Sequence, residues 1–498
     1  MFKKILIANR GEIAVRIIAA CKELGIKSAA VYSEIDFNSM HAALSDEAYF
    51  IGPPAASQSY LNIDKIISLA KKIGADAIHP GYGFLSENPV FISEVEKSGI
   101  TFIGPSAKSV EMMGNKTAAR TLMNKHNVPI VPGTTQTIKT IDEVKEEAGK
   151  IGYPVMLKAA AGGGGKGMRL VNNPDDLQSA FDRAKNEALK AFGNPDIYLE
   201  KFIENPKHIE VQIIGDKFGN YAHIFERECS IQRRHQKVVE ESPSVFVDEN
   251  LRKEITQAAV KAAKACGYYN AGTVEFLMDK NKNFYFLEMN TRLQVEHPVT
   301  ELVSGIDLVK EQIKIAAGEK LSFSNKDLTL NGHAIECRIY AEDIHNNFAP
   351  STGKIEYHSV PSGPGIRIDR GIETNSVVPV YYDPLLAKVI TWGKTRYEAI
   401  NRMKRALAQY QILGVTTNTE LFTYILNSND FLNGTFDINF LENVLLPEIN
   451  GLRSTEISKQ TEEAAVILSA LLKQVEMEKL KTGVGYNGKN KWVEQKYE

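Results

Sequence analysis

The segment from Asn283 to Val299, NFYFLEMNTRLQVEHPV, combines two carboxylates, several amides, an arginine and a histidine in one short stretch. Its apolar residues Phe284, Phe286 and Leu287 predict a buried strand. Glu288 and Asn290 follow on alternate positions, so we expect both side chains on the same face of that strand. Two oxygen ligands on one rigid face suit a hard divalent cation such as Mg²⁺.

Three further polar residues, Arg292, Gln294 and Glu296, continue the same alternation. They add a guanidinium fork for an anion, an amide and a candidate general base. The alternative is an exposed strand edge that carries ordinary surface charge, since charged strand faces are common. The rest of the chain favours the interpretation as a site.

The second motif is AGGGGKGMRL, from Ala161 to Leu170. A run of glycines frees the backbone to close around phosphates. Gly162, Gly164 and Gly167 match GxGxxG, but the strand-like MRLV follows, whereas a dinucleotide site needs a helix there. The segment does not match a Walker loop either, because that motif ends in Gly-Lys-Ser/Thr, whereas here Lys166 precedes Gly167. We expect a mobile lid over a nucleotide, between two strands of a hairpin; the alternative is a flexible surface loop.

Single charged residues support a phosphate site. Lys158 ends the strand before the glycine run, and Lys116 lies at a helix start in GNKTAAR. Both are candidate phosphate ligands, although each alone is typical of a solvated lysine. Glu275, in TVEFLM, is a third carboxylate on a strand, and we expect it to share one or two magnesium ions with Glu288.

The segment ERECSIQRRHQKVVEESP places Arg227 and a basic run up to Lys237 ahead of Glu240 and Glu241. Such a run is also typical of a solvated face. Its function therefore depends on the context that the other motifs supply.

The elements that position these residues fall into several units. The chain has 498 residues, which indicates about three domains. The first hundred residues alternate strand and helix, as in a parallel α/β layer. From Lys116 to about Gly332 we expect an α+β domain, with helices at 116–126, 141–151 and 175–192. A third α+β unit follows from His333 to about Leu445.

Composition excludes several classes of protein. The net charge of −2 gives no electrostatic basis for binding nucleic acid or an anionic membrane. The longest apolar runs are too short to span a bilayer, and the start, MFKKILIANR, resembles a strand rather than a signal peptide. Four scattered cysteines without CxxC spacing predict a reduced, cytoplasmic protein with no structural zinc.

Six motifs in order, ANRGEIAVR, HPGYGFLSEN, GGGGKGMR, CSIQRRHQKVVEE, EMNTRLQVEHPVTE and GHAIECRIYAED, resemble biotin carboxylase, an ATP-grasp ligase. The resemblance covers about residues 1–446. It implies a Rossmann-like N-terminal domain over 1–115 and an ATP-grasp domain over 116–332 with a lid at about 131–203. A C-terminal α+β biotin carboxylase domain over 333–447 and a helical tail over 448–498 complete the predicted organisation.

The resemblance implies a role for each matching residue. ATP would bind Lys116, Lys158, Gly163, Gly164, Gly165, Gly167, Met168, Glu200, Lys201, Ile203, His208, Gln232, His235, Glu275 and Glu288. Mg²⁺ or Mn²⁺ would be held by Glu275, Glu288 and Asn290. Bicarbonate would be bound by Lys237, Arg292, Gln294 and Val295. Glu296 would remove the bicarbonate proton, with Arg292 and Lys237 also catalytic.

Biotin would meet Tyr82 and Arg338, and Arg338 would stabilise the ureido oxyanion. Without the resemblance, Arg338 would be interpreted as a structural ion pair with Glu336 or Glu342. No AMKM-like biotin attachment hairpin occurs, and Lys404 lies in a helical context. The implied partners are therefore a separate biotin carboxyl carrier protein and a carboxyltransferase subunit. The family also implies a homodimer, with Arg16 and the region 382–383 as contact positions.

Beyond the resemblance, the apolar residues from Ile457 to Leu480 have helical spacing. They predict a helix that packs either on its own chain or on a partner, which is the carrier subunit, the carboxyltransferase subunit or a second copy of the chain, with Trp492 as an anchor. Two other functions compete with biotin carboxylation: a carbamoyl-phosphate synthase-type ligase and a non-catalytic scaffold. The first lacks the biotin-facing GYGF and ECRIYAED segments, and the second would have damaged ligands. The final acceptor, whether acetyl-CoA, propionyl-CoA or pyruvate, is not encoded here.

Overall fold

The computed structural model describes residues 1–160, 167–449 and 466–474. The chain divides into two compact units, Met1–Leu441 and Glu442–Glu498. The first unit holds every described residue of the predicted site. In the second, residues 466–474 are helical and carry exposed apolar side chains, including Ile467 and Leu471. The glycines at 163–165 and Trp492 lie outside the described residues.

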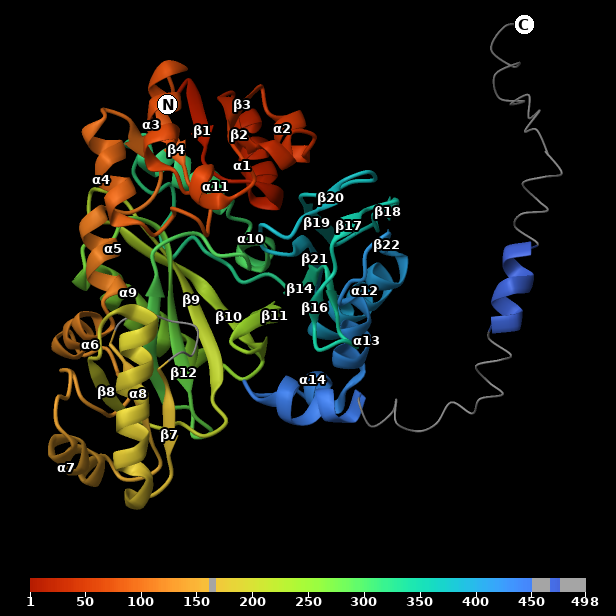
Figure 1. The fold of residues 1–498 in the computed structure, drawn as a ribbon. Coiled ribbons are helices and arrows are strands. Elements are labelled where there is room, and N and C mark those ends of the chain that lie inside the picture. Colours follow the sequence, from red (N-terminus) through yellow and green to blue (C-terminus); the bar gives the residue numbers. More distant parts are fainter. Residues whose placement is uncertain (161–166, 450–465, 475–498) are drawn as a thin grey trace, which may run out of the picture. The chain divides into compact units, whose positions relative to one another are not determined.

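The N-terminal part is a five-stranded parallel sheet in the order β3-β2-β1-β4-β5 (Figure 1). Its strands are β1 Lys4–Ile7, β2 Lys27–Ser33, β3 Glu47–Gly52, β4 Ala77–His79 and β5 Thr101–Phe102. Its helices are α1 Gly11–Glu23, α2 Met40–Leu44, α3 Ile63–Lys72 and α4 Pro89–Lys97. The strand order reverses between β1 and β4, and ligands bind at such a point. There the Asn9 amide donates to the carbonyls of Pro80 and Tyr82, both at 2.7 Å.

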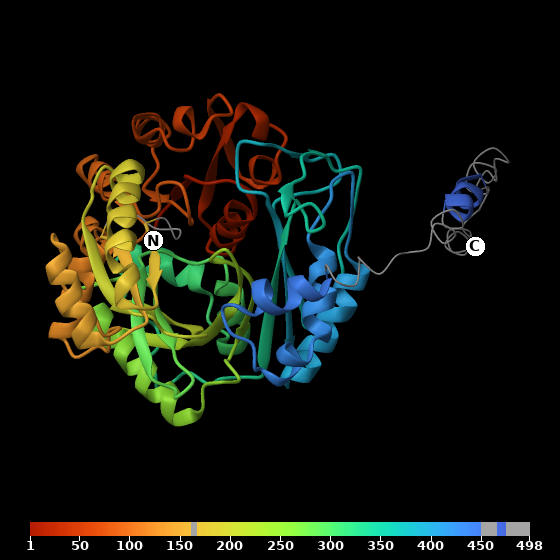
Figure 2. The same cartoon turned by 60° about the horizontal axis from the view of Figure 1, so that its bottom comes forward.

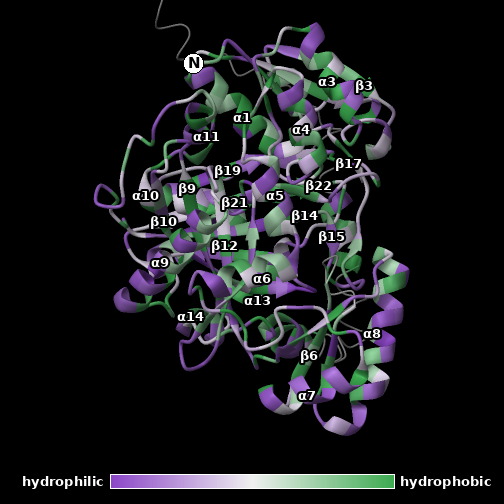
Figure 3. Cartoon of the chain, turned by 90° about the vertical axis from the view of Figure 1, so that its left-hand side faces the viewer, coloured by the Kyte–Doolittle hydropathy of each residue, from purple (hydrophilic) through white to green (hydrophobic). Residues whose placement is uncertain are grey.

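A three-stranded sheet, in the order β7-β6-β8, forms the predicted hairpin unit. It contains β6 Val155–Ala159, β7 Arg169–Val171 and β8 Ile197–Lys201, with α7 Ile141–Ile151 and α8 Leu177–Phe192 against it. The antiparallel pairing of β6 with β7 confirms that the glycine run joins two strands of a hairpin. A capping box of Thr140 and Glu143 begins α7. Purple and green residues alternate along α7 and α8, as expected of amphipathic helices (Figure 3).

An eight-stranded antiparallel sheet, β13-β12-β9-β10-β11-β14-β21-β19, runs through the centre of the first unit. Its strands are β9 Lys207–Gly215, β10 Tyr221–Arg233, β11 Gln236–Ser242, β12 Asn270–Met278, β13 Phe284–Asn290, β14 His333–Tyr340, β19 Ile366–Arg370 and β21 Leu385–Gly393. The predicted central and C-terminal domains thus share one sheet. Figure 2 shows the N-terminal elements, the β6–β8 sheet and the C-terminal helices arranged around it.

The remaining elements cover this sheet or link its strands. The helices are α5 Ala107–Gly114, α6 Lys116–Lys125, α9 Glu249–Ala265, α10 His297–Ser304, α11 Leu308–Ala316, α12 Arg396–Gln409, α13 Thr419–Asn427 and α14 Asn429–Asn433. The short strands are β15 Glu342–Asp343, β16 Ala349–Pro350, β17 Gly353–Lys354, β18 Tyr357–Ser359, β20 Val377–Val378 and β22 Gln411–Leu413. Among the described residues, no helix is long and apolar enough to cross a membrane.

One detail of the predicted strand is wrong. β13 ends at Asn290, and residues 291–296 form a turn before α10 begins at His297. Pro298, in the first turn of α10, is well suited to a helix start. The strand alternation therefore holds for Glu288 and Asn290 but not for Arg292, Gln294 and Glu296, which the turn positions instead.

Candidate active site

A cavity of about 900 Å³ collects the predicted site residues. It is bounded by the β1–α1 loop, the segment 82–84, the β6–β8 sheet, the β10–β11 hairpin, the β12–β13 pair and the turn after β13. Among the described site residues, all except Gly167 line it. They are Tyr82, Lys116, Lys158, Met168, Glu200, Lys201, Ile203, His208, Gln232, His235, Lys237, Glu275, Glu288, Asn290, Arg292, Gln294, Val295, Glu296 and Arg338.

Two carboxylates face each other across β12 and β13, where Glu275 and Glu288 are register partners. The Asn290 amide donates to Glu275 Oε1 at 2.8 Å, and His208 Nε2 lies 3.0 Å from Glu275 Oε2. Burial alone would raise the pKa of Glu275, but the charges of Lys237 and His208 outweigh it and hold that pKa well below its usual range.

The pKa of Glu288, the register partner of Glu275, shifts in the opposite direction. Burial, followed by repulsion from Glu275, raises the pKa of Glu288. A divalent cation would relieve this repulsion, and carboxylate and amide oxygens are its preferred ligands. The donor set of Glu275, Glu288 and Asn290 therefore fits Mg²⁺ or Mn²⁺.

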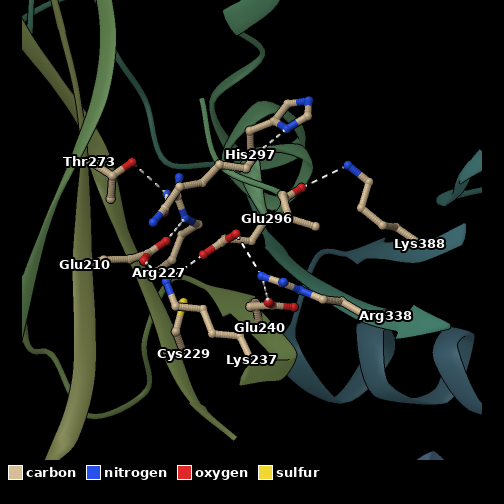
Figure 4. A network of polar contacts seen from close by, with 12 residues as sticks. Glu210, Arg227, Cys229, Lys237, Glu240, Thr273, Glu296, His297, Arg338 and Lys388 are labelled. Atoms are coloured by element: carbon tan, nitrogen blue, oxygen red, sulfur yellow. Dashed lines mark hydrogen bonds and ion pairs between the residues drawn. The ribbon is translucent and has the colours of Figure 1, made fainter. Parts of the chain in front are cut away.

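A cluster of charges, which we call the base cluster, joins the buried residues Glu210, Glu240, Glu296 and Arg338 to the partly buried Lys237 (Figure 4). Lys237 Nζ lies 2.5 Å from Glu210, 2.8 Å from Glu275 and 2.7 Å from Glu296. Arg338 Nη2 lies 2.9 Å from Glu296 and 2.5 Å from Glu240. Its ion-pair partners are thus Glu296 and Glu240 rather than Glu336 or Glu342, the alternative that would apply without the resemblance, because β14 pairs with β11, the strand that carries Glu240.

The base cluster keeps Glu296 ionised. Burial would raise its pKa, but Lys237 and Arg338 lower it well below the ordinary value. At Glu240 burial dominates, and its pKa rises to about 7 although Arg338 opposes the change. Ionisation leaves Glu296 in the protonation state that a proton acceptor needs, while its lowered pKa makes it a weaker base than a free carboxylate.

Behind the base cluster lies Arg227, whose side chain is fully buried. Its guanidinium pairs with Glu210 and donates to Gln294 Oε1 at 2.8 Å. This contact fixes the Gln294 amide, so its Nε2 donates to Glu275 Oε1 at 2.8 Å. The residues from Glu226 to Gln232 and from Val238 to Ser242 are thus interior strand, whereas Arg234 and His235, at the turn between β10 and β11, are exposed. The apolar neighbours of Arg227 in IFERECSI were the sign in the sequence that this segment is a buried strand.

The guanidinium of Arg292 is held by Glu87, a residue that sequence reasoning did not single out. Arg292 Nε donates to Glu87 Oε2 at 2.7 Å, and its Nη2 donates to Asn290 Oδ1 at 3.0 Å. The other oxygen of Glu87 accepts from the Thr291 backbone at 2.9 Å. Glu87 lies in the HPGYGFLSEN motif, so the N-terminal loop positions the residue predicted to bind bicarbonate.

At the hairpin end of the cavity, Glu200 is buried between two cations, Lys158 and Arg120. Lys201 Nζ donates to the carbonyls of Gly152 and Tyr153 at 3.0 and 2.9 Å. Lys158, predicted to be a phosphate ligand, thus has a carboxylate partner here. Arg120 was missed, because nothing in its helical sequence indicates a partner 80 residues away.

The opposite end of the cavity is aromatic. The hydroxyl of Tyr82 is buried without a hydrogen-bond partner in the described part of the chain. The Tyr382 hydroxyl donates to the carbonyl of Pro54 and lies 2.7 Å from the Ser33 hydroxyl, and the Arg10 guanidinium lies 4.3 Å from its ring centroid. Tyr82 and Arg338, the two residues expected to meet biotin, both line this cavity.

Three domain families match the chain in sequence. Residues 1–110 match the biotin carboxylase N-terminal domain, 115–324 the ATP-binding domain of the carbamoyl-phosphate synthase L chain, and 336–443 the biotin carboxylase C-terminal domain. A pyruvate carboxylase subunit of Methanothermobacter thermautotrophicus is 54% identical over 442 residues, which cover 89% of this chain and 90% of that protein. The chain belongs to the biotin carboxylase family.

Other relatives agree with this assignment. Biotin carboxylase 1 of Bacillus subtilis is 52% identical over 443 residues, covering 89% of this chain and 98% of that protein. A solved biotin carboxylase of Campylobacter jejuni has a TM-score of 0.85 at 48% identity, covering 89% and 98% of the two chains. The biotin carboxylase domain dimer of Hydrogenobacter thermophilus 2-oxoglutarate carboxylase, solved with MgADP, ADP and bicarbonate, has a TM-score of 0.84 at 51% identity, covering 89% and 97%. The three-domain fold expected from the sequence is confirmed.

Proposed function

We propose that this chain uses ATP and bicarbonate to carboxylate biotin that is attached to a separate carrier protein. As a member of its family it is an ATP-dependent ligase, and the reaction is the first half-reaction of a multisubunit carboxylase. The observation that carries the proposal is the position of Glu296: an ionised carboxylate, buried between Lys237 and Arg338, in the same turn as Arg292, Gln294 and Val295. An anion bound to this turn lies within reach of a base.

In the proposed mechanism, Arg292, Gln294 and the Val295 backbone orient bicarbonate, and Glu296 accepts its proton. The freed oxygen attacks the γ-phosphate of ATP, which gives carboxyphosphate and ADP. Lys237 neutralises charge at the reacting phosphate. Carboxyphosphate then breaks down to carbon dioxide and phosphate, and phosphate accepts the ureido proton of biotin as its nitrogen attacks carbon dioxide.

The other site residues bind and orient the substrates. Lys116, Lys158 and His208 meet the phosphates or ribose, while Glu200, Lys201 and Ile203 lie at the adenine edge, and Gln232 and His235 near the sugar. Glu275, Glu288 and Asn290 would hold Mg²⁺ or Mn²⁺, which screens the phosphate charge when bound. Tyr82 packs against biotin, and Arg338 stabilises the ureido oxyanion. Gly167 and Met168, with the glycines at 163–165, belong to the lid.

We also propose the boundaries 1–115, 116–332 and 333–447 for the three domains, with the lid at about 131–203. The partners are a biotin carboxyl carrier protein, a carboxyltransferase subunit and a second copy of the chain. One relative crystallised as a dimer, which supports the last of these. Four buried, unpaired cysteines support a reducing compartment such as the cytoplasm.

The deciding experiment measures ATP hydrolysis by the full chain with Mg²⁺, adding bicarbonate and free biotin singly and together. We expect hydrolysis that depends on both. Hydrolysis that needs bicarbonate but ignores biotin would favour a carbamoyl-phosphate synthase-type ligase. No hydrolysis under any condition would favour a non-catalytic scaffold.

The tail after Leu446 is proposed to dock a partner subunit, because its apolar residues have helical spacing. Truncation after Leu446 should leave carboxylation of free biotin within about threefold of the parent and weaken assembly with the carrier or carboxyltransferase subunit. Unchanged co-purification of the partner, or collapse of the truncated chain's activity, would contradict this role.

A further inference from the structure

Lys388, in the middle of β21, is a fully buried lysine that does not line the active-site cavity. Its neighbours on the adjoining strands are Arg338 of β14 and Asp369 of β19, both in register with it. The side chain therefore emerges directly beside a residue of the base cluster. Figure 4 shows it reaching toward the turn that carries Glu296.

The Lys388 ammonium bridges three parts of the fold. Its shortest contact, at 2.9 Å, is donation to the Val295 carbonyl in the turn after β13. Glu12 Oε2, at the start of α1, lies 3.2 Å away, and Asp369 Oδ2 lies 3.7 Å away. Asp369 has a closer cation of its own, because Arg367 donates to both of its oxygens at 2.8 Å.

A fully buried ammonium is an inefficient way to stabilise a fold. Desolvation of two charges offsets most of their attraction, so apolar residues of similar volume stabilise comparable positions equally well. The nearest partner of Lys388 is moreover a neutral carbonyl rather than a carboxylate. The arrangement is better suited to orienting a peptide group than to adding stability.

The carbonyl that Lys388 holds belongs to the peptide bond joining Val295 to Glu296. The preceding carbonyl, of Gln294, is bound by His297 Nδ1 at 2.8 Å, and the Gln294 side chain is bound by Arg227. The turn is therefore held on one side by the Arg227 network and on the other by Lys388. Displacement of reacting groups by about 1 Å is enough to cost on the order of a hundredfold in rate.

We propose that Lys388 is a positioning residue for the carboxylation reaction: its ammonium fixes the Val295 carbonyl and so sets the turn that presents Val295 and Glu296 to bicarbonate. This inference rests on the proposed function of that turn. Lys388 acts through the Val295 peptide and does not touch the substrates. It also connects the turn to α1 of the N-terminal domain through Glu12.

The test uses three variants of the full chain. Lys388→Met removes the ammonium, and Lys388→Met with Glu12→Gln removes it while also removing the carboxylate that it neutralises. Asp369→Asn is the matched control, since it changes the most distant partner of the ammonium and leaves the Val295 contact in place. Each is assayed for kcat and for the KM of ATP and bicarbonate in biotin-dependent ATP hydrolysis, with thermal unfolding recorded in parallel.

We expect both Lys388→Met variants to show a bicarbonate KM raised about tenfold and a kcat lowered about tenfold, with the ATP KM within about threefold of the parent. Asp369→Asn should stay within about threefold in every parameter. If Lys388 had only a structural role, its replacement would lower thermal stability without changing the KM for bicarbonate more than the KM for ATP.

Parental bicarbonate kinetics in the folded double variant would overturn the proposal, as would an equal loss in Asp369→Asn. Failure of both Met variants to fold would assign Lys388 to stability and overturn it too. A parent that shows no bicarbonate- and biotin-dependent hydrolysis would instead refute the proposed function, independently of Lys388.

Discussion

The two sides of the cavity are built differently. The base cluster lies on β9, β11 and β14 of the eight-stranded sheet and in the turn after β13, and its charges are buried or nearly so and paired with one another. The hairpin unit of β6, β7 and β8 forms a separate sheet, which in the described residues shares no ladder with the larger one. Proton transfer needs fixed distances, whereas a nucleotide must enter and leave. A rigid sheet on one side and a separable one on the other meet both needs.

The most severe test of the rigid side is Glu296→Gln. The variant keeps the shape of the side chain but loses the proton acceptor, so bicarbonate-dependent turnover should fall by roughly 10²–10⁴. ATP affinity and thermal stability should change little in comparison. A turnover within about threefold of the parent would remove Glu296 from the mechanism.

Stability of the rigid side should depend on pH through Glu241, the residue after Glu240 on β11. Its carboxylate is buried and bound by His333 at 2.7 Å and by Arg396 at 2.7 and 3.1 Å. Burial would raise its pKa, but His333 and Arg396 lower it from 4.5 to about 2. A lowered folded-state pKa contributes stability above pH 4.5 that is lost as pH falls toward 2.

Glu241→Gln should therefore lower the free energy of unfolding at pH 7 by on the order of 3 kcal/mol. The difference from the parent should shrink between pH 4.5 and pH 2. Thermal melts across this range measure it. A difference that stays constant with pH would show that Glu241 contributes through packing rather than charge.

On the hairpin side, Gly167→Ala should raise the KM for ATP about tenfold, because backbone strain of this kind costs about 1–3 kcal/mol. Gly167 has a φ of +72°, and an added Cβ would lie 2.9 Å from the Cβ of Ala159. Gly149→Ala in α7 is the matched control, since no atom lies within 4 Å of its added Cβ. If Gly167→Ala showed normal ATP kinetics but lower thermal stability, this end of the hairpin would contribute to folding rather than to ATP binding.

The smallest effect is expected from Lys150→Gln on α7. Lys150 is exposed and lies 2.8 Å from both Glu146 and Glu147. Exposed pairs of this kind contribute only about 0–1 kcal/mol, and salt screens them. Thermal stability and ATP kinetics should stay close to the parent's, and a tenfold change in the KM for ATP would contradict a peripheral role for this surface.

Local patterns carried much of the prediction. Periodicity predicted the helix 141–151 with its bounds, and the apolar run before Glu288 predicted β13. Short-range pattern failed where the chain turns, so Arg292, Gln294 and Glu296 were assigned to a strand that ends at Asn290. A Pro two residues after Glu296 was the available sign of a new helix.

Pairings between distant residues could not be predicted from pattern. The contact of Glu87 with Arg292 spans 205 positions, and that of Lys388 with Val295 spans 93. Both arise because separate parts of the chain meet at the cavity. The sequence shows that these residues are charged, but only the tertiary fold shows which partner each of them contacts.

The continuous eight-stranded sheet also limits where this enzyme can be divided and recombined with a homologous carboxylase. The proposed boundary at 332/333 falls between β11 and β14 along the sheet order, yet these two strands are hydrogen-bonded neighbours from Val239 and Cys337 to Ser242 and Ala334. A fragment cut at that boundary would expose an unpaired strand edge on each half, and such edges promote aggregation. Exchange with another carboxylase should therefore succeed when the central and C-terminal parts are transferred together, so that both halves of the sheet come from the same parent.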